Sequence, residues 1–223
     1  MQNKYNFYSK NVFYNKQNAE LSSKKKTQVL DDKNNLYELD KFNYSKKEFL
    51  LKGENVKIKT NFNSNINSDE YFFESGFFDL DNRNFNASNT KISMQKSIFG
   101  NIENDPRLFG VTSFKEGKIT QVNKGMFTSC KKREGCPPWS IQAQKIIHDK
   151  KKKQLIYDHA LLKVYDFPIV YFPKFFHPDP TVKRQSGLLK PILNESETLG
   201  SSLQLPYFKT VSYTHLRAHE TIP

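Results

Sequence analysis

Short hydrophobic runs alternate with polar turns along most of the chain, and this pattern predicts β-strands. Residues 110–114 are separated by a polar turn from 119–122, and 140–147 are separated in the same way from 155–165. Turn signals of this kind recur roughly every 12–18 residues. No long segment has the 3.6-residue periodicity of a helix. We therefore expect an all-β protein.

Two of the predicted strands contain a break at their middle. Residues 50–58 and 157–165 each place a small or polar residue there and then resume hydrophobic alternation. Residues 71–80 are expected to form an aromatic strand pair. Bent strands stacked on one another give a V-shaped β-solenoid or an open jelly roll, in which stacking buries faces that one unit cannot bury alone. An ordinary β-sandwich fits the same spacing, and we favour the stack of bent strands.

Residues 161–193 are expected to join two different β structures. The first half of this stretch is nearly continuous in strand-forming residues, and four prolines punctuate it: Pro168, Pro173, Pro178 and Pro180. Proline lacks a backbone donor, so it occurs at edge strands, strand starts and bends. A new apolar run begins after Gly187 and is interrupted by Pro191.

Aromatic residues supply most of the material for a core. Only 36% of the 223 residues are hydrophobic, but 14% are aromatic, including 19 Phe and 11 Tyr. The formal net charge of +12 comes largely from short basic runs at expected turns. These runs are solvated turn tips or a surface that attracts acidic ligands. Nucleic-acid binding is not expected, because it would place basic residues beside aromatic ones along the strands.

The beginning of the sequence shows no targeting segment. Residues 1–5 lead directly into polar and aromatic sequence, and no run of apolar residues is long enough for a membrane-spanning helix. This pattern fits a cytosolic protein or an internal fragment of an exported one.

Two cysteines, Cys130 and Cys136, are separated by five residues. The spacing suits a small loop closed by a disulfide in an oxidising compartment, while free thiols or pairing with cysteines elsewhere remain open. His148 is the nearest further metal ligand and has no partner at zinc-ligand spacing, so no metal is expected.

Enzyme chemistry is poorly supported. His177 lies near Asp179, but no G-x-S-x-G nucleophile motif and no phosphate-binding glycine-rich loop are present. A β-solenoid enzyme acting on polysaccharide would need clustered Asp, Lys and Arg on one sheet face, and the sequence shows none. We expect no catalytic residues and no cofactor.

Several motifs in the second half of the chain are long and specific. They are WSIQA at 139–143, IHD at 147–149, FPIVYFP at 167–173, HPD at 177–179 and RQSGLLKP at 184–191. With them the chain resembles the LPS-assembly outer-membrane protein family (the LptD or OstA family). The resemblance is strong over 110–208 and generic over 11–104.

The resemblance implies a periplasmic OstA-like β-jelly roll at residues 1–185, the start of an outer-membrane β-barrel at 186–210, and a non-native tail at 211–223, which resembles translated sequencing-adapter sequence. The jelly roll would hold the lipid A acyl chains of lipopolysaccharide and pass them to the barrel. Candidate groove residues are Val164, Phe167, Ile169 and Tyr171. The alternative is a free periplasmic protein that bridges lipopolysaccharide without entering a membrane.

The implied location is the cell outer membrane, with this segment mainly periplasmic. The implied partners are lipopolysaccharide, a barrel-plugging LptE-like lipoprotein, a periplasmic LptA-like bridge jelly roll and the outer membrane. Pro191 and Pro206 fall on the family's lateral-gate motifs, and we favour the gate over the alternative that Pro191 simply ends a short strand. Cysteines of the family can form long-range disulfides between jelly roll and barrel, so pairing of Cys130 with Cys136 stays open.

Overall fold

A computed structural model of the chain describes residues 5–64, 68–94, 105–131, 137–178, 186–189, 192–196 and 200–209. All regular secondary structure in these ranges is β, which confirms the predicted class. No helix in this part of the chain is long and apolar enough to span a bilayer. The strands are β1 (Tyr5–Ser9), β2 (Phe13–Asn15), β3 (Glu20–Ser23), β4 (Thr27–Asp31), β5 (Leu36–Leu39), β6 (Lys41–Ser45), β7 (Leu50–Lys59), β8 (Glu70–Asp79), β9 (Asn84–Ser93), β10 (Arg107–Glu116), β11 (Ile119–Thr128), β12 (Trp139–Asp149), β13 (Gln154–Val164), β14 (Phe167–Pro178), β15 (Gly187–Leu188), β16 (Ile192–Ser196), β17 (Gly200–Gln204) and β18 (Tyr207–Phe208).

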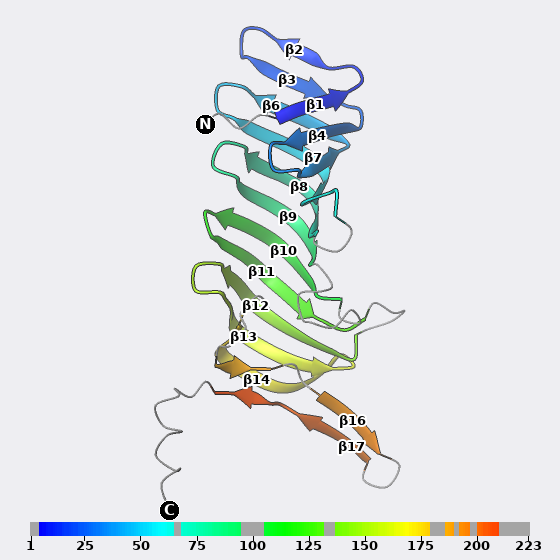
Figure 1. Cartoon of the computed structure of the whole chain (residues 1–223), viewed down its shortest axis with the longest axis vertical. Coiled ribbons are helices and arrows are strands. Elements are labelled where there is room, and N and C mark those ends of the chain that lie inside the picture. The colour runs from blue at the N-terminus through cyan, green and yellow to red at the C-terminus, as the bar shows by residue number, and fades with distance from the viewer. Residues whose placement is uncertain are drawn as a thin grey trace, which may run out of the picture.

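Strands β1 to β14 form one 14-stranded antiparallel sheet. From β7 to β13 each strand pairs with the strands that precede and follow it in the sequence, and β14 pairs with β13. The result is a tall stack, with the N-terminal strands at one end and β14 near the other (Figure 1). The sheet does not close into a barrel, because β14 does not pair with the N-terminal strands.

The long strands bend at a common level. Asn55, Asn89, Lys124 and His159 lie at the middle of β7, β9, β11 and β13, with φ values of 50°, 46°, 48° and 50°. Such left-handed values are uncommon for residues other than glycine, and they interrupt the alternation of the strand. Two adjacent residues then face outward, as the burial pattern iBeBeeBeBi of β7 shows. The predicted stack of bent strands is confirmed.

One detail of the strand prediction was wrong. Residues 71–80, expected as a strand pair, belong almost entirely to the single bent strand β8. The break in alternation at Glu74 and Ser75 is a bend rather than a turn, because both halves pair with the same neighbours β7 and β9.

Each bent strand contributes one half to each of two arms. Arm 1 comprises residues 50–54, 75–79, 84–88, 112–116, 119–123, 145–149, 154–158 and 174–178, and arm 2 comprises residues 56–59, 70–73, 90–93, 107–110, 125–128, 139–143, 160–164 and 167–172. Before β7 the arms are built from separate strands. β6, β3 and β2 extend arm 1, while β5, β4 and β1 extend arm 2.

Small residues occupy the inner side of the bend. A Cβ atom added at Gly110 would lie 2.0 Å from Cγ1 of Val122, and one added at Gly125 would lie 2.7 Å from Cδ1 of Ile146. Both contacts are far shorter than van der Waals separations. Glycine is needed at these positions because neighbouring side chains already fill the angle of the V.

Aromatic rings connect the arms across the interior. The pairs that join the arms include Phe7–Tyr44, Phe73–Phe85, Phe127–His177 and Phe172–Phe175, with ring centroids 5.3, 5.0, 5.7 and 5.0 Å apart. Buried residues form one hydrophobic cluster within 29–87 and a second within 92–162. The aromatic content of the sequence therefore serves as the core.

The C-terminal strands lie outside the large sheet. β15 pairs with β18, and β16 pairs with β17, each as a two-stranded antiparallel sheet. The expected junction near residue 186 and the start of a barrel at 186–210 both stay predictions. Residues 211–223 lie outside the described ranges.

Candidate functional site

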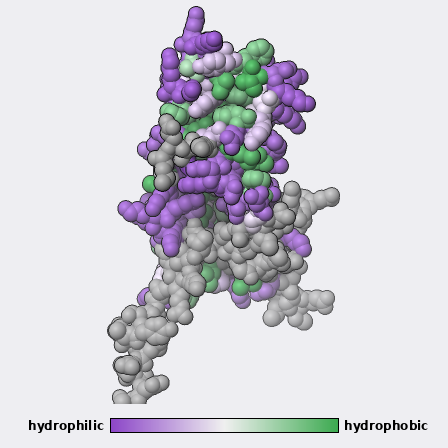
Figure 2. All heavy atoms as spheres, turned by 45° about the horizontal axis from the view of Figure 1, so that its top comes forward, coloured by the Kyte–Doolittle hydropathy of each residue, from purple (hydrophilic) through white to green (hydrophobic). Residues whose placement is uncertain are grey.

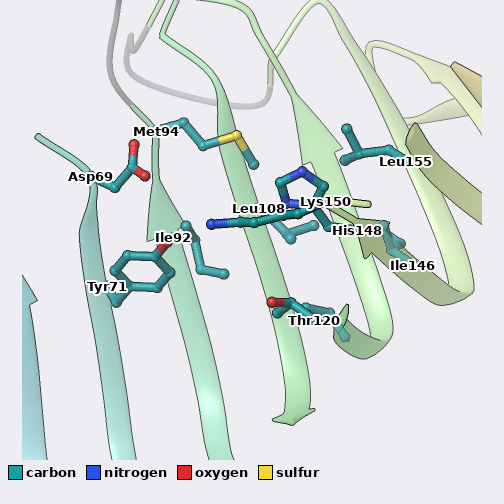
Figure 3. Close-up of a pocket in the computed structure, with 11 residues that line it drawn as sticks. Asp69, Tyr71, Ile92, Met94, Leu108, Thr120, Ile146, His148, Lys150 and Leu155 are labelled. Carbon is teal, nitrogen blue, oxygen red and sulfur yellow. The ribbon is translucent and has the colours of Figure 1, made fainter. Parts of the chain in front are cut away.

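The mouth between the two arms contains two cavities lined mainly by apolar side chains. The first has a volume of about 60 Å³. Tyr71, Ile92 and Leu108 line it from arm 2, and Ile146 lines it from arm 1 (Figure 3). Val122 also lines it from arm 1. These inward positions alternate with outward ones on both sides of the bend, which is why five different strands converge on one space.

The second cavity lies toward the N-terminus and has a volume of about 190 Å³. Tyr37 and Ile58 line it from the arm 2 side, and Phe78 and Phe85 line it from arm 1. Burial, followed by the nearby Asp31 carboxylate, raises the pKa of the Tyr37 hydroxyl, so this group stays neutral in the cavity wall.

Tyr71 lies at the boundary of the two cavities. Its side chain lines both of them and packs against both hydrophobic clusters. Its ring stacks on Phe73 with centroids 6.2 Å apart, and burial raises the pKa of its hydroxyl. Thr120 and Lys150 also line both cavities. The interior is therefore one groove of two compartments, and Tyr71 is the aromatic residue at their boundary, together with Thr120 and Lys150.

The size of the cavities limits what the closed groove can hold. Pockets for small molecules usually have volumes of about 300–1,000 Å³. The compartments, at about 60 and 190 Å³, are smaller. A long apolar ligand therefore requires the arms to part or the aromatic side chains to rotate away.

Basic side chains gather at the rim of arm 1. Arg83, Lys115 and Lys150 all line the larger cavity. Burial lowers the pKa of the Lys115 ammonium, and the positive charges of Lys150, Arg83 and Lys33 lower it further. Arg83 donates from Nη2 to Oδ1 of Asp32 at 2.8 Å. The site thus combines an apolar interior with a cationic edge.

Three of the four candidate groove residues lie on the outer face of β14. Phe167, Ile169 and Tyr171 are 73%, 51% and 52% exposed, while Val164 is half-buried. Val170 and Phe172, which alternate with these residues along β14, pack against the core, as does Phe175 beyond the bend of the strand. The outer placement follows from the two-residue alternation of a strand. Lipid contact by the four candidates stays a prediction.

The other predicted site residues divide between described and undescribed parts of the chain. Cys130 is buried, with Sγ 3.8 Å from the carbonyl oxygen of Trp139, whereas Cys136 lies outside the described residues, so their pairing stays a prediction. Pro206 accepts a hydrogen bond at its carbonyl from the amide of Leu189 at 2.8 Å. Pro191 also lies outside the described residues, and the gate role of both prolines stays a prediction.

No group of three or more His, Cys, Asp or Glu side chains could hold a metal ion within the described ranges. The groove residues Tyr71, Ile92 and Leu108, and the rim residues Lys115 and Lys150, were not predicted from the sequence. The usable signal was the pair of adjacent outward residues at each bend. Counting alternate positions from that pair identifies the inward residues of both arms.

No family model matches the chain, whereas curated proteins match it clearly. LPS-assembly protein LptD of Pseudomonas entomophila is 30% identical over 159 residues, which cover 71% of this chain and 15% of that relative. The protein of the same name from Hahella chejuensis is 28% identical over 133 residues, which cover 59% of this chain and 15% of that relative. The protein of the same name from Polaromonas sp. is 31% identical over 98 residues, which cover 43% of this chain and 12% of that relative.

The chain thus spans 12–15% of the length of these three relatives. The similarity agrees with the family resemblance of the sequence, and the structure is an all-β stack of bent strands. The chain belongs to the LPS-assembly protein LptD family.

Proposed function

We propose that this chain takes part in the transport and assembly of lipopolysaccharide at the outer membrane. The groove between the arms holds the lipid A acyl chains and passes them along the stack toward a barrel. The observation that carries this proposal is the apolar interior between two arms, extending through both hydrophobic clusters, in a chain of the LptD family. The process needs binding and release without covalent chemistry.

The architecture suits reversible opening. The ladder hydrogen bonds join each strand to its neighbours along the stack, whereas the contacts across the interior are largely between side chains. Parting the arms therefore leaves the ladders intact. Each methylene group of an acyl chain that leaves water contributes about 0.8 kcal/mol, which offsets the loss of ring contacts such as Phe73–Phe85.

The N-terminal end of the stack suits contact with a second jelly roll. Among the described strands, β1 and β2 each pair on one side only, and edge strands of this kind can be extended by a strand of a partner. Tyr8, Phe13 and Tyr14 are exposed there, and Figure 2 shows hydrophobic side chains between hydrophilic margins at this end. An LptA-like periplasmic protein is the partner we propose for this edge.

The opposite end of the stack would face the membrane. In this arrangement the jelly roll lies in the periplasm, and residues 186–210 begin an outer-membrane barrel that an LptE-like lipoprotein plugs. Pro191 and Pro206 would weaken strand pairing at a lateral gate, because each lacks a ladder donor.

Photo-crosslinking from two matched tyrosines tests the groove. A photoreactive phenylalanine derivative replaces Tyr71, which lines both cavities, or Tyr171, which is 52% exposed on the outer face. The purified chain is then irradiated with lipopolysaccharide. Crosslinks from position 71 and few from position 171 are expected. Crosslinks mainly from position 171 would instead place the lipid on the outer face and refute the interior groove.

A further inference from the structure

Three basic side chains that are distant in the sequence meet at one edge of the groove. Arg83 lies in the turn between β8 and β9, Lys115 lies near the end of β10, and Lys150 follows β12. All three line the larger cavity. Successive hairpins of an antiparallel meander place alternate turns at the same edge, so the fold gathers these side chains on the tips of arm 1.

Two of the three cations have no carboxylate partner within the described ranges. Arg83 is paired with Asp32 at 2.8 Å. Lys115 donates from Nζ to the backbone carbonyl oxygen of Arg83 at 3.0 Å, which uses one of its three donors. Neither Lys115 nor Lys150 forms an ion pair in the part of the chain that the structure describes.

The carboxylate of Asp79 also lines this cavity, but it already accepts hydrogen bonds from residues of its own turn. Its oxygens accept hydrogen bonds from the amides of Asp81 and Asn82 at 3.0 and 2.9 Å and from Nδ2 of Asn82 at 2.8 Å. Asp79 is therefore engaged locally rather than with Lys115 or Lys150.

Lys150 is positioned over the apolar part of the groove. Its backbone amide donates to the carbonyl oxygen of Lys118 at 3.0 Å, which joins two neighbouring turns of arm 1. From there its side chain extends across the cavity toward the strand that carries Ile92 (Figure 3). Its side chain shares this cavity with the apolar side chains of Ile92 and Leu108 and with the carboxylate of Asp69.

The arrangement costs electrostatic free energy that an anion would recover. Like charges converge on Lys115, and partial burial strengthens their repulsion because less water screens it. A ligand with a negative group at the rim and hydrocarbon below it would satisfy both the cations and the apolar walls. Phosphate accepts charge-assisted hydrogen bonds from lysine ammonium groups and suits this edge.

We propose that Lys115 and Lys150, with Arg83 beside them, bind a phosphate monoester of an amphiphile whose acyl chains lie in the groove. The inference rests on the proposed function and adds the position of the headgroup. The amphiphile is held with its phosphate at the tips of arm 1, so the lipid enters and leaves through the mouth with its polar part toward water.

Charge-removing variants test the site. Lys115→Gln/Lys150→Gln is compared with Lys47→Gln/Lys57→Gln, which removes the same charge from exposed positions outside the groove. Three probes are bound to the whole purified chain in detergent: bisphosphorylated lipid A, the same lipid after phosphatase treatment, and inorganic phosphate. The first variant should bind bisphosphorylated lipid A about tenfold more weakly, and the control variant should bind it as the wild type does.

Further measurements keep the test decisive. Lys150→Gln alone changes an exposed residue and should retain the wild-type circular dichroism spectrum while weakening binding of the phosphorylated lipid. The dephosphorylated lipid should bind wild type and variants equally. Equal affinity of the wild type for both lipids would overturn the phosphate site while leaving the groove intact.

The remaining outcomes separate this site from the proposed function. Loss of inorganic phosphate binding in Lys115→Gln/Lys150→Gln, with no lipid crosslinks from Tyr71, would support an anion site for free phosphate and refute the lipid groove. Crosslinks from Tyr71 with no preference for phosphate in any probe would support the groove and overturn the anion site.

Discussion

Replacing Gly110 with alanine changes the inner side of the bend by a single methyl group. That methyl would lie 2.0 Å from Cγ1 of Val122 and 3.2 Å from the backbone oxygen of Asn123. Gly110 does not adopt a positive φ, whereas Gly117 and Gly200 do. The effect of the substitution therefore comes from lack of space rather than from backbone strain.

The expected cost follows from the packing. Val122 is 1% exposed, so it cannot move into solvent, and inserting a methyl group into a filled core costs about 1–3 kcal/mol. Val122→Ala alone removes two methyl groups, which at about 0.8 kcal/mol each, plus a cavity contribution, gives about 2 kcal/mol. In the double variant Gly110→Ala/Val122→Ala, the new methyl group occupies space that the Val122 side chain leaves. Its loss in free energy of unfolding should therefore be smaller than the sum of the two single-variant losses by at least about 1 kcal/mol.

Urea unfolding followed by far-ultraviolet circular dichroism measures these free energies on the whole chain. Gly117→Ala is the matched control, because its φ is +55° and a Cβ there meets no atom within 4 Å. It should cost about 1 kcal/mol through the left-handed backbone and should add to Val122→Ala without coupling. A neutral Gly110→Ala, or a double variant that is simply additive, would refute the account of the bend.

Three further predictions concern the groove and its ends. Tyr71→Ala should join the two cavities and raise the binding capacity for an apolar fluorescent dye, and unchanged dye emission would count against a dividing role. Tyr157→Phe removes the hydroxyl that lies 2.7 Å from Nε2 of His177 and should lower the free energy of unfolding by about 1 kcal/mol, measured in urea, whereas wild-type stability would contradict this. Burial raises the pKa of Asp79, but hydrogen bonds from its turn, including those from Asn82, outweigh it and hold this pKa below its ordinary value. The contribution of Asp79 to stability is therefore present above the unfolded-state pKa and is lost as the pH falls through the folded-state value. Asp79→Asn should consequently show a smaller fall in the urea midpoint than wild type between about pH 5 and pH 3, and an equal fall would contradict the assignment.

The fold was predicted from the local order of apolar and polar residues. The break after Leu51 and the one before Leu161 each appear as a small or polar interruption of an alternating run, and both are bends in the structure. A bend is readable from sequence because it changes which residues face inward, and that change is visible in the order of apolar and polar residues.

The inward-facing residues of β14 could not be identified from the sequence in the same way. Apolar residues occupy both parities there, so Phe167, Ile169 and Tyr171 could not be distinguished from Val170 and Phe172. Pairing with β13 decided between them, since Tyr171 lies opposite Leu161, whose side chain is only half-buried, and Phe172 lies opposite the fully buried Ala160.

The sequence by itself determined the all-β class, the bent strands and the family resemblance, because each depends on residues that are neighbours along the chain. Only the tertiary structure decided that Arg83, Lys115 and Lys150 share one rim and that Tyr71 lies at the boundary of the two compartments. Those residues come from different hairpins, and their proximity depends on how the arms stack and close on each other. Contacts across the mouth of the V leave no regular spacing in the sequence, so they appear only when both arms are in place.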